Sequence, residues 1–142
     1  MVFRRQLTRA AGITATAFLL ASLAMRAAIA ADCNFSLGPC TKTCTGRTIT
    51  LDIAPKPVSA MEELTFSMTI TPCSSLPDTL ILDLGMPGMV MGRNRVVMKK
   101  TSGCTWSGKG IIVRCMSGRT LWQATILSDA LNNTAFTFHV KY

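Results

Sequence analysis

The chain has 142 residues, 49% hydrophobic and 15% charged, with 15 Lys and Arg against 7 Asp and Glu. It contains one histidine, which excludes a blue-copper electron carrier because such a site needs two. No G-x-S-x-G nucleophile motif and no C-x-x-C redox pair is present, so we expect no enzyme. Basic runs interleaved with aromatic residues are also missing, so we expect no nucleic-acid partner.

Residues 1–31 have the layout of a secretory signal peptide. Three arginines open the segment, residues 10–24 are apolar, and Ala28-Ile29-Ala30 fits the small-x-small cleavage rule. We therefore expect a bacterial protein that is periplasmic or secreted and has no membrane span in its mature form. Two alternatives stay open. In the first alternative, the segment is not cleaved and is retained as an N-terminal anchor. In the second, Arg4-Arg5 directs export by the twin-arginine route.

Residues 32–46 form a lead-in rich in Cys, Gly and Thr, without periodicity. Cleavage before it leaves 11 basic and 7 acidic residues, a net charge of +4. The mature part is the size of one domain, which we place at residues 47–142.

All six cysteines lie in the mature part, and an even number in a small exported domain predicts disulfides. Sequence alone does not choose among the pairings. A zinc site made of Cys33, Cys40 and Cys44 is the competing interpretation.

After the lead-in, short β-like runs alternate with turn signals. In the second run, for example, Leu64, Phe66, Met68 and Ile70 share one face. The seven predicted strands are residues 47–53, 63–71, 79–84, 94–100, 110–115, 120–127 and 135–142. Seven strands at this spacing, with no convincing helix, predict an all-β, immunoglobulin-like antiparallel β-sandwich.

Successive strands of an antiparallel sandwich reverse direction, so loops alternate between its two ends. The loops after the first, third and fifth strands then share one end, which we call the methionine end. It holds five of the seven methionines of the mature part: Met61, Met86, Met89, Met91 and Met116. By the same reasoning Cys73 and Cys104 meet at the opposite end, and we predict a disulfide between them. Cys115 lies at the methionine end, where we consider pairing with Cys40 or Cys44.

The stretch Met86-Pro87-Gly88-Met89-Val90-Met91 is the most distinctive motif of the chain. Pro followed by Gly at the centre of a turn favours type II geometry, which brings Met86 close to Met89. Met89 and Met91 point the same way if their segment is extended. Thioether sulfur is a soft, uncharged ligand that suits Cu(I), so we predict a Cu(I) site at Met86, Met89, Met91 and Met116. Methionine is also a common filler of apolar gaps and contact surfaces, and this alternative stays open.

The same motifs carry a family resemblance over roughly residues 48–142. M-P-x-M-x-M is followed by Gly108-Lys109-Gly110, then by Ser117-Gly118 with Trp122 four residues later, then by A-T-I. In this order the motifs resemble those of the YtkA-like and FixH-like domains. The resemblance implies a small exported or membrane-tethered β-sandwich associated with copper handling and cytochrome oxidase maturation. The methionine motif of the family corresponds to Met86, Met89 and Met91. The cysteine-rich lead-in and the Cys73/Cys104 pair depart from the family pattern.

Two hypotheses follow. The first is a periplasmic Cu(I)-binding protein or copper chaperone, acting in copper homeostasis or oxidase maturation, whose partners are the copper ion and a periplasmic protein that donates or receives it. The second is a non-catalytic immunoglobulin-like interaction or assembly module, in which the methionines form an apolar docking patch.

Overall fold

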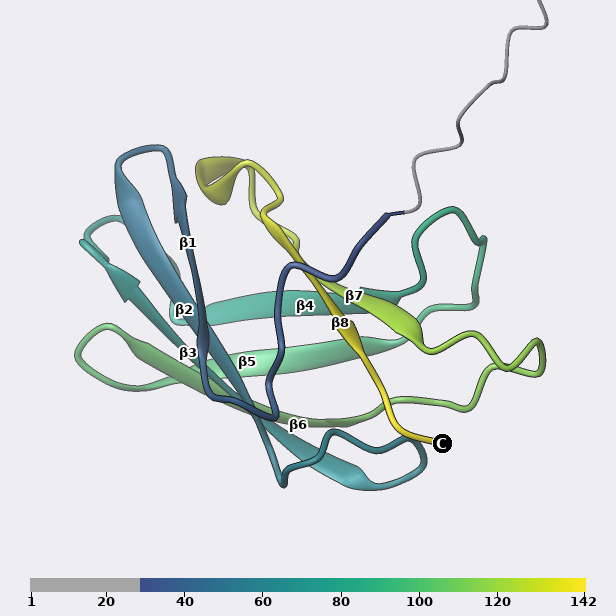
Figure 1. Ribbon diagram of the computed structural model, residues 1–142. Coiled ribbons are helices and arrows are strands. Elements are labelled where there is room, and N and C mark those ends of the chain that lie inside the picture. Colours follow the sequence, from purple (N-terminus) through teal and green to yellow (C-terminus); the bar gives the residue numbers. More distant parts are fainter. Residues whose placement is uncertain (1–28) are drawn as a thin grey trace, which may run out of the picture.

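The computed structural model describes residues 29–142, and these form eight strands and one short 3₁₀ helix (Figure 1). The predicted signal peptide lies almost wholly outside the described residues. The elements are β1 (Cys40–Cys44), β2 (Arg47–Ala54), β3 (Glu63–Thr71), β4 (Thr79–Gly85), β5 (Arg95–Ser102), β6 (Thr105–Ile111), β7 (Leu121–Ile126), η1 (Asp129–Leu131) and β8 (Ala135–His139).

The strands form one antiparallel sheet in the order β1-β2-β3-β6-β5-β4-β7-β8, which curls until it is nearly closed. The all-β antiparallel prediction is therefore confirmed. The first, second and fifth predicted strands lie together in one half, and the third, sixth and seventh lie together in the other, as in immunoglobulin-like sandwiches. The fourth, β5, pairs with both β4 and β6 and so joins the two halves.

Two strands differ from the prediction. β1 comes from the lead-in, where we expected no regular structure, and it adds an eighth strand beside β2. β6 begins at Thr105 and ends at Ile111, whereas the prediction placed this strand at residues 110–115. The bounds of the second predicted strand are confirmed, and those of the remaining strands agree to within a few residues at each end.

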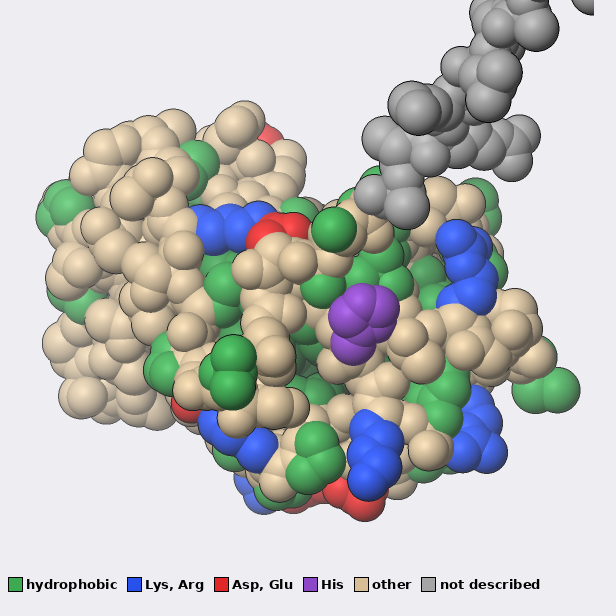
Figure 2. Space-filling view, viewed as in Figure 1, with side chains coloured by type: hydrophobic (Ala, Val, Ile, Leu, Met, Phe, Trp, Pro, Cys, Tyr) green, Lys and Arg blue, Asp and Glu red, His purple; other side chains and the backbone are tan. Residues whose placement is uncertain are grey.

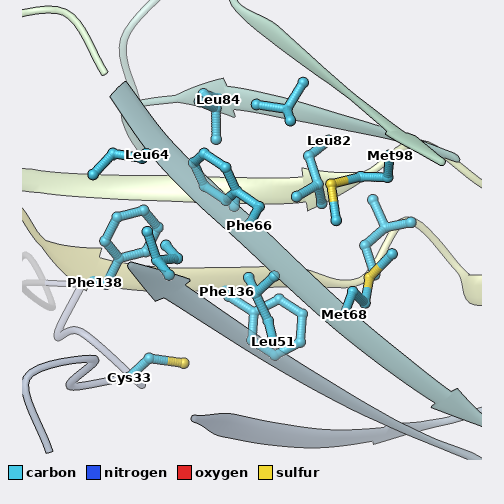
Figure 3. Close-up of a cluster of buried hydrophobic side chains, with 14 of the residues drawn as sticks. Cys33, Leu51, Leu64, Phe66, Met68, Leu82, Leu84, Met98, Phe136 and Phe138 are labelled. Carbon is cyan, nitrogen blue, oxygen red and sulfur yellow. The ribbon is translucent and has the colours of Figure 1, made fainter. Parts of the chain in front are cut away.

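The core lies between the two halves of the curled sheet. Every second residue of the central strands points inward, and Leu64, Phe66, Met68 and Ile70 of β3 are all fully buried. Figure 3 shows Leu64, Phe66 and Met68 among the core side chains, together with Leu82 and Leu84 of β4 and with Phe136 and Phe138 of β8. The predicted apolar faces are thus the buried faces, and their burial removes apolar surface from water, the main driving force for folding.

The predicted disulfide between Cys73 and Cys104 is present, with a Cα–Cα distance of 5.4 Å. A second disulfide joins Cys33 to Cys40. The pairing considered for Cys115 is wrong: Cys40 is already bonded, and Cys44 lies at the end of β1 that faces away from the methionine end. The Cys33–Cys40 bond also removes the zinc alternative, because disulfide sulfurs are not thiolate ligands.

Candidate methionine site

The methionine end exists as predicted from strand direction. Every pair of neighbouring strands is antiparallel, so the β2–β3, β4–β5 and β6–β7 loops lie at one end of the sheet. In Figure 1 the loops after β4 and after β6 both stand at the right of the molecule. Met61, Met116 and the methionine-rich stretch sit on these three loops.

The Met86–Met89 segment forms the turn that its sequence favours. The backbone amide of Met89 donates a hydrogen bond of 3.1 Å to the carbonyl oxygen of Met86. Gly88 has a φ of 72°, which a type II turn requires at its third position and which a residue without Cβ adopts at little cost. The turn folds the chain back just where β4 ends, so Met89 and Met91 return toward the sheet.

Met86, Met89 and Met91 line a common hollow of about 300 Å³. Its floor comes from β4 and β7, which pair here through Asp83↔Thr125 and Gly85↔Gln123. Met86 is only 5% exposed, and Met89 and Met91 are partly buried against the core. Three methionines therefore line one partly enclosed space whose other walls include Asp83, Gln123 and Thr125, residues with a carboxylate, an amide and a hydroxyl.

The structure does not bring Met116 into this hollow. Met116 is fully exposed on the β6–β7 loop and does not line the space that the other three share. Met61, on the β2–β3 loop, is 66% exposed and lines a different, shallower surface with Ile111 and Val113. Of the four predicted ligands, three share one cavity, while Met116 is at the same end of the fold but in solvent.

Cys115 is a functional candidate that the sequence analysis does not identify, because it considers only a pairing of Cys115 with Cys40 or Cys44. Its thiol is free and lies 2.9 Å from the Ser117 hydroxyl. Hydrogen bonds from the Ser117 side chain and backbone lower its pKa. Burial opposes them, and the backbone and charge of Arg119 add smaller lowering contributions, so the net shift of the pKa is downward. Cys115 precedes Met116 on the β6–β7 loop, so a thiol with enhanced thiolate character lies at the methionine end.

Charges near the hollow are few and paired. Asp83, at its edge, accepts a hydrogen bond of 3.1 Å from the Arg95 guanidinium across the β4–β5 ladder. Figure 2 shows the basic side chains of one face in small separate groups, some of them beside acidic side chains. His139 is exposed on edge strand β8, and its Nδ1 lies 3.0 Å from the Thr120 hydroxyl.

Within residues 29–142, no three or more His, Cys, Asp or Glu side chains are grouped so as to hold a metal ion. The same described part of the chain has no helix both long enough and apolar enough to pass through a bilayer. Its two disulfides are consistent with an extracellular protein.

The comparisons with known proteins give no match. No family model fits the sequence, and neither a known protein nor a solved structure is significantly similar to it.

Proposed function

We propose that the chain is an exported Cu(I)-binding protein or copper chaperone whose metal site is the hollow lined by Met86, Met89 and Met91. The observation that carries the proposal is the placement of three thioether side chains around one partly enclosed space. Thioethers are soft and neutral, so they favour Cu(I) over hard cations such as Ca²⁺ and Mg²⁺. The resemblance of the methionine motif to YtkA-like and FixH-like domains points to the same metal.

The chemistry of the compartment supports methionine as the ligand. Four of the six cysteines are consumed in disulfides, and thioethers do not form disulfides. The partial burial of Met89 and Met91 holds their side chains near the sheet. The open side of the hollow would let a donor or acceptor protein reach the metal directly. Met116 stands on a separate exposed loop at the same end of the fold, and it is the proposed fourth ligand.

The test is a competition titration of Cu(I) against a chromophoric chelator, repeated with Ag(I). Both free thiols are first removed by Cys44→Ser and Cys115→Ser, so that thiolates do not bind the metal. In this background, joint replacement of Met86, Met89 and Met91 by Leu should weaken Cu(I) binding by more than roughly tenfold, because changes even outside the ligand set of a metal site cost that much. Leucine keeps the apolar volume and removes only the sulfur.

Met61→Leu is the matched control, because Met61 is exposed at the same end but does not line the hollow. It should leave the affinity unchanged. Met116→Leu measures the fourth ligand separately. If the variant with Leu at residues 86, 89 and 91 binds Cu(I) and Ag(I) with unchanged affinity, the copper proposal is wrong.

The second candidate function is an interaction module, and one observation favours it. Several large apolar side chains are exposed at or near the methionine end: Met61, Val90, Ile111, Val113 and Met116. Clustered exposed apolar residues commonly mark protein contact sites. Retention of Cu(I) binding by the triple Leu variant, or no binding by the parent, would leave this candidate in place.

A further inference from the structure

The nearly closed sheet has one seam, between its edge strands β1 and β8. Among the described residues no backbone ladder joins these two strands. Side chains of β1 cross the gap instead: the Lys42 ammonium donates to the carbonyl oxygen of Ala135 at 2.5 Å, and the Cys44 thiol donates to that of Leu131 at 3.2 Å. The seam is therefore held without the repeated hydrogen bonds that hold every other strand pair.

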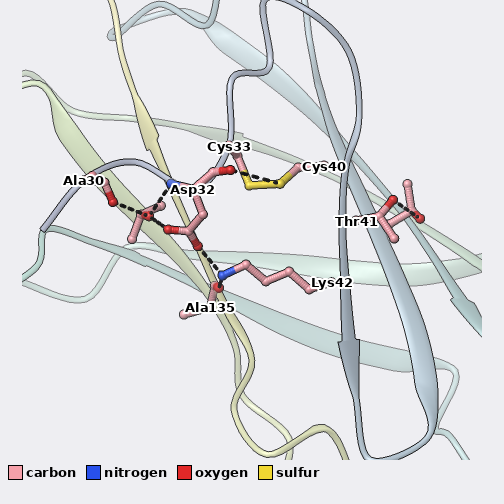
Figure 4. The surroundings of a disulfide bond; sticks show 9 residues. Ala30, Asp32, Cys33, Cys40, Thr41, Lys42 and Ala135 are labelled. Atoms are coloured by element: carbon pink, nitrogen blue, oxygen red, sulfur yellow. Dashed lines mark hydrogen bonds and ion pairs between the residues drawn. A yellow bond between two sulfur atoms is a disulfide. The ribbon is translucent and has the colours of Figure 1, made fainter.

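Residues 30–36, which we call the strap, lie along this seam and bond to both sides. Toward β8, the backbone amide of Cys33 donates to the Thr137 carbonyl oxygen at 2.9 Å, and that of Asp32 donates to the Thr137 hydroxyl at 3.0 Å. Toward β1, Asp32 forms an ion pair with Lys42 (Figure 4). The Cys33–Cys40 disulfide pins the strap to β1 as a covalent cross-link, in addition to the chain itself, which reaches β1 through residues 37–39.

The strap also covers apolar surface of the core. Phe35 is 3% exposed, and its ring stands edge-on to that of Phe138, with centroids 5.2 Å apart. Yet the strap does not pack tightly along its whole length. A hollow of about 470 Å³ is lined by strap residues together with Val58 and His139. The strap therefore has a few firm contacts and a loosely filled flank.

The second disulfide is placed differently. Cys73 and Cys104 join segments that follow β3 and precede β6, and these strands already pair up to Thr69↔Thr105. The amide of Ile70 also donates to the Cys104 carbonyl oxygen at 3.0 Å. Losing this disulfide leaves its strands held by their ladder. Losing Cys33–Cys40 leaves the strap bonded to β8, but joined to β1 only by side-chain bonds and by the chain through residues 37–39.

We propose that the strap is a redox-sensitive closure of the sheet, in which the Cys33–Cys40 disulfide keeps β1 and β8 together. A dithiol reductant opens it. One reductant thiolate attacks Sγ of Cys40, the more exposed of the two cysteines, and expels the Cys33 thiolate, which leaves a mixed disulfide between the reductant and Cys40. The second thiolate of the reductant then attacks the reductant sulfur of this mixed disulfide and releases the Cys40 thiolate. The reductant becomes a disulfide, and the two cysteines gain two electrons and two protons. Release of the strap then uncovers Phe138 and the free edge of β8. This proposal does not depend on copper binding.

The test is hydrogen exchange followed by mass spectrometry on the exported protein. In Cys73→Ser/Cys104→Ser, only the strap disulfide can be reduced, and dithiothreitol should raise exchange in peptides of residues 30–44 and 135–140 by roughly tenfold or more. Peptides of β3, residues 63–71, should keep their protection. Without dithiothreitol the same variant should protect the seam as the parent does.

Cys33→Ser/Cys40→Ser should show the open seam without any reductant. Unchanged seam exchange after reduction would overturn the proposal, and so would loss of protection in all strands together, since a strap must open locally. If Cys73→Ser/Cys104→Ser fails to fold, the parent protein is titrated with dithiothreitol and alkylated. The proposal then requires Cys33–Cys40 to be reduced first and seam exchange to rise at that step.

Discussion

Cys115 is a free thiol in a polar setting. The Ser117 hydroxyl, the Ser117 backbone, and the backbone and charge of Arg119 all favour its thiolate, and together they outweigh the opposing effect of burial. The other free cysteine, Cys44, instead donates its thiol hydrogen to the Leu131 carbonyl oxygen. The two free thiols therefore lie at opposite ends of the fold in different surroundings.

The lowered pKa of Cys115 predicts fast alkylation. A larger thiolate fraction at neutral pH should make iodoacetamide react with Cys115 at lower pH than with an ordinary cysteine. Ser117→Ala removes the largest favourable contribution and should shift the pH profile of the rate upward, toward the ordinary value. The measurement is the alkylation rate between pH 6 and 10 (roughly the titration range of thiols) in a Cys44→Ser background. A profile that Ser117→Ala leaves in place would contradict this assignment.

At the residue scale, sequence reasoning predicts the Met86–Met89 turn and the Cys73–Cys104 bond, because both depend on local geometry or on strand direction. It fails for Cys115 because disulfide pairing depends on which cysteine the lead-in brings close. That choice is made by the pairing of β1 with β2, which places Cys40 opposite Leu51 and beside Cys33. No spacing rule in the sequence contains this information.

Strand β6 is an element whose bounds cannot be predicted from alternating apolar residues. Its inward positions after Trp106 are Gly108 and Gly110, so no apolar alternation is visible there. The glycines are required because β5 passes close to them. A Cβ on Gly108 would lie 2.4 Å from the Val97 carbonyl oxygen, and one on Gly110 would lie 2.5 Å from a methyl group of Val96. The close packing of β5 on β6 thus requires glycine at these positions, and the glycines remove the apolar alternation by which the sequence would indicate a strand.

Gly108→Ala should therefore destabilise the protein. The added methyl group meets backbone, which cannot rotate away, so we expect a loss of about 1–3 kcal/mol in the free energy of unfolding, as for overpacked cores. Gly92→Ala is the control, since a Cβ there meets nothing within 4 Å. Urea unfolding followed by tryptophan fluorescence measures both, because Trp106 and Trp122 are fully buried. Equal stability of the two variants would contradict the close approach.

At the scale of the whole molecule, closure of the sheet is what the sequence could not predict. The all-β class and the order of loops follow from periodicity and alternation. The seam instead depends on β1, whose inward residues are Cys40, Lys42 and Cys44. A strand whose inward residues are a lysine and two cysteines has no apolar stripe. Its role in closing the sheet becomes visible only from the contacts of Lys42 with Asp32 and with the Ala135 carbonyl oxygen.

The Asp32–Lys42 pair predicts how seam stability depends on pH. Burial raises the pKa of Asp32. Hydrogen bonds from Lys42 and Thr137, together with the positive charge of Lys42, lower the pKa by more than burial raises it, so the net shift is downward. A carboxyl group with a lower pKa in the folded state stabilises the fold above its unfolded pKa of about 3.9, and this contribution is lost as pH falls through the folded value. Among the described residues that line the hollow beside Asp32, the other ionisable side chain is the imidazole of His139.

Asp32→Asn removes this contribution at neutral pH. Because the Asp32 side chain is 38% exposed, solvent screens the pair, and we expect a loss of about 1 kcal/mol or less. The difference from the parent protein should be constant between pH 7 and about pH 5 and should shrink below about pH 4, where the parent carboxyl becomes protonated. Urea unfolding across this range measures it. Glu63→Gln is the control, because Glu63 pairs with Lys109 on the surface of an existing β3–β6 ladder and both side chains are about two-thirds exposed. A parent–Asp32→Asn difference that persists unchanged at pH 3 would show that the ionised carboxylate does not hold the seam.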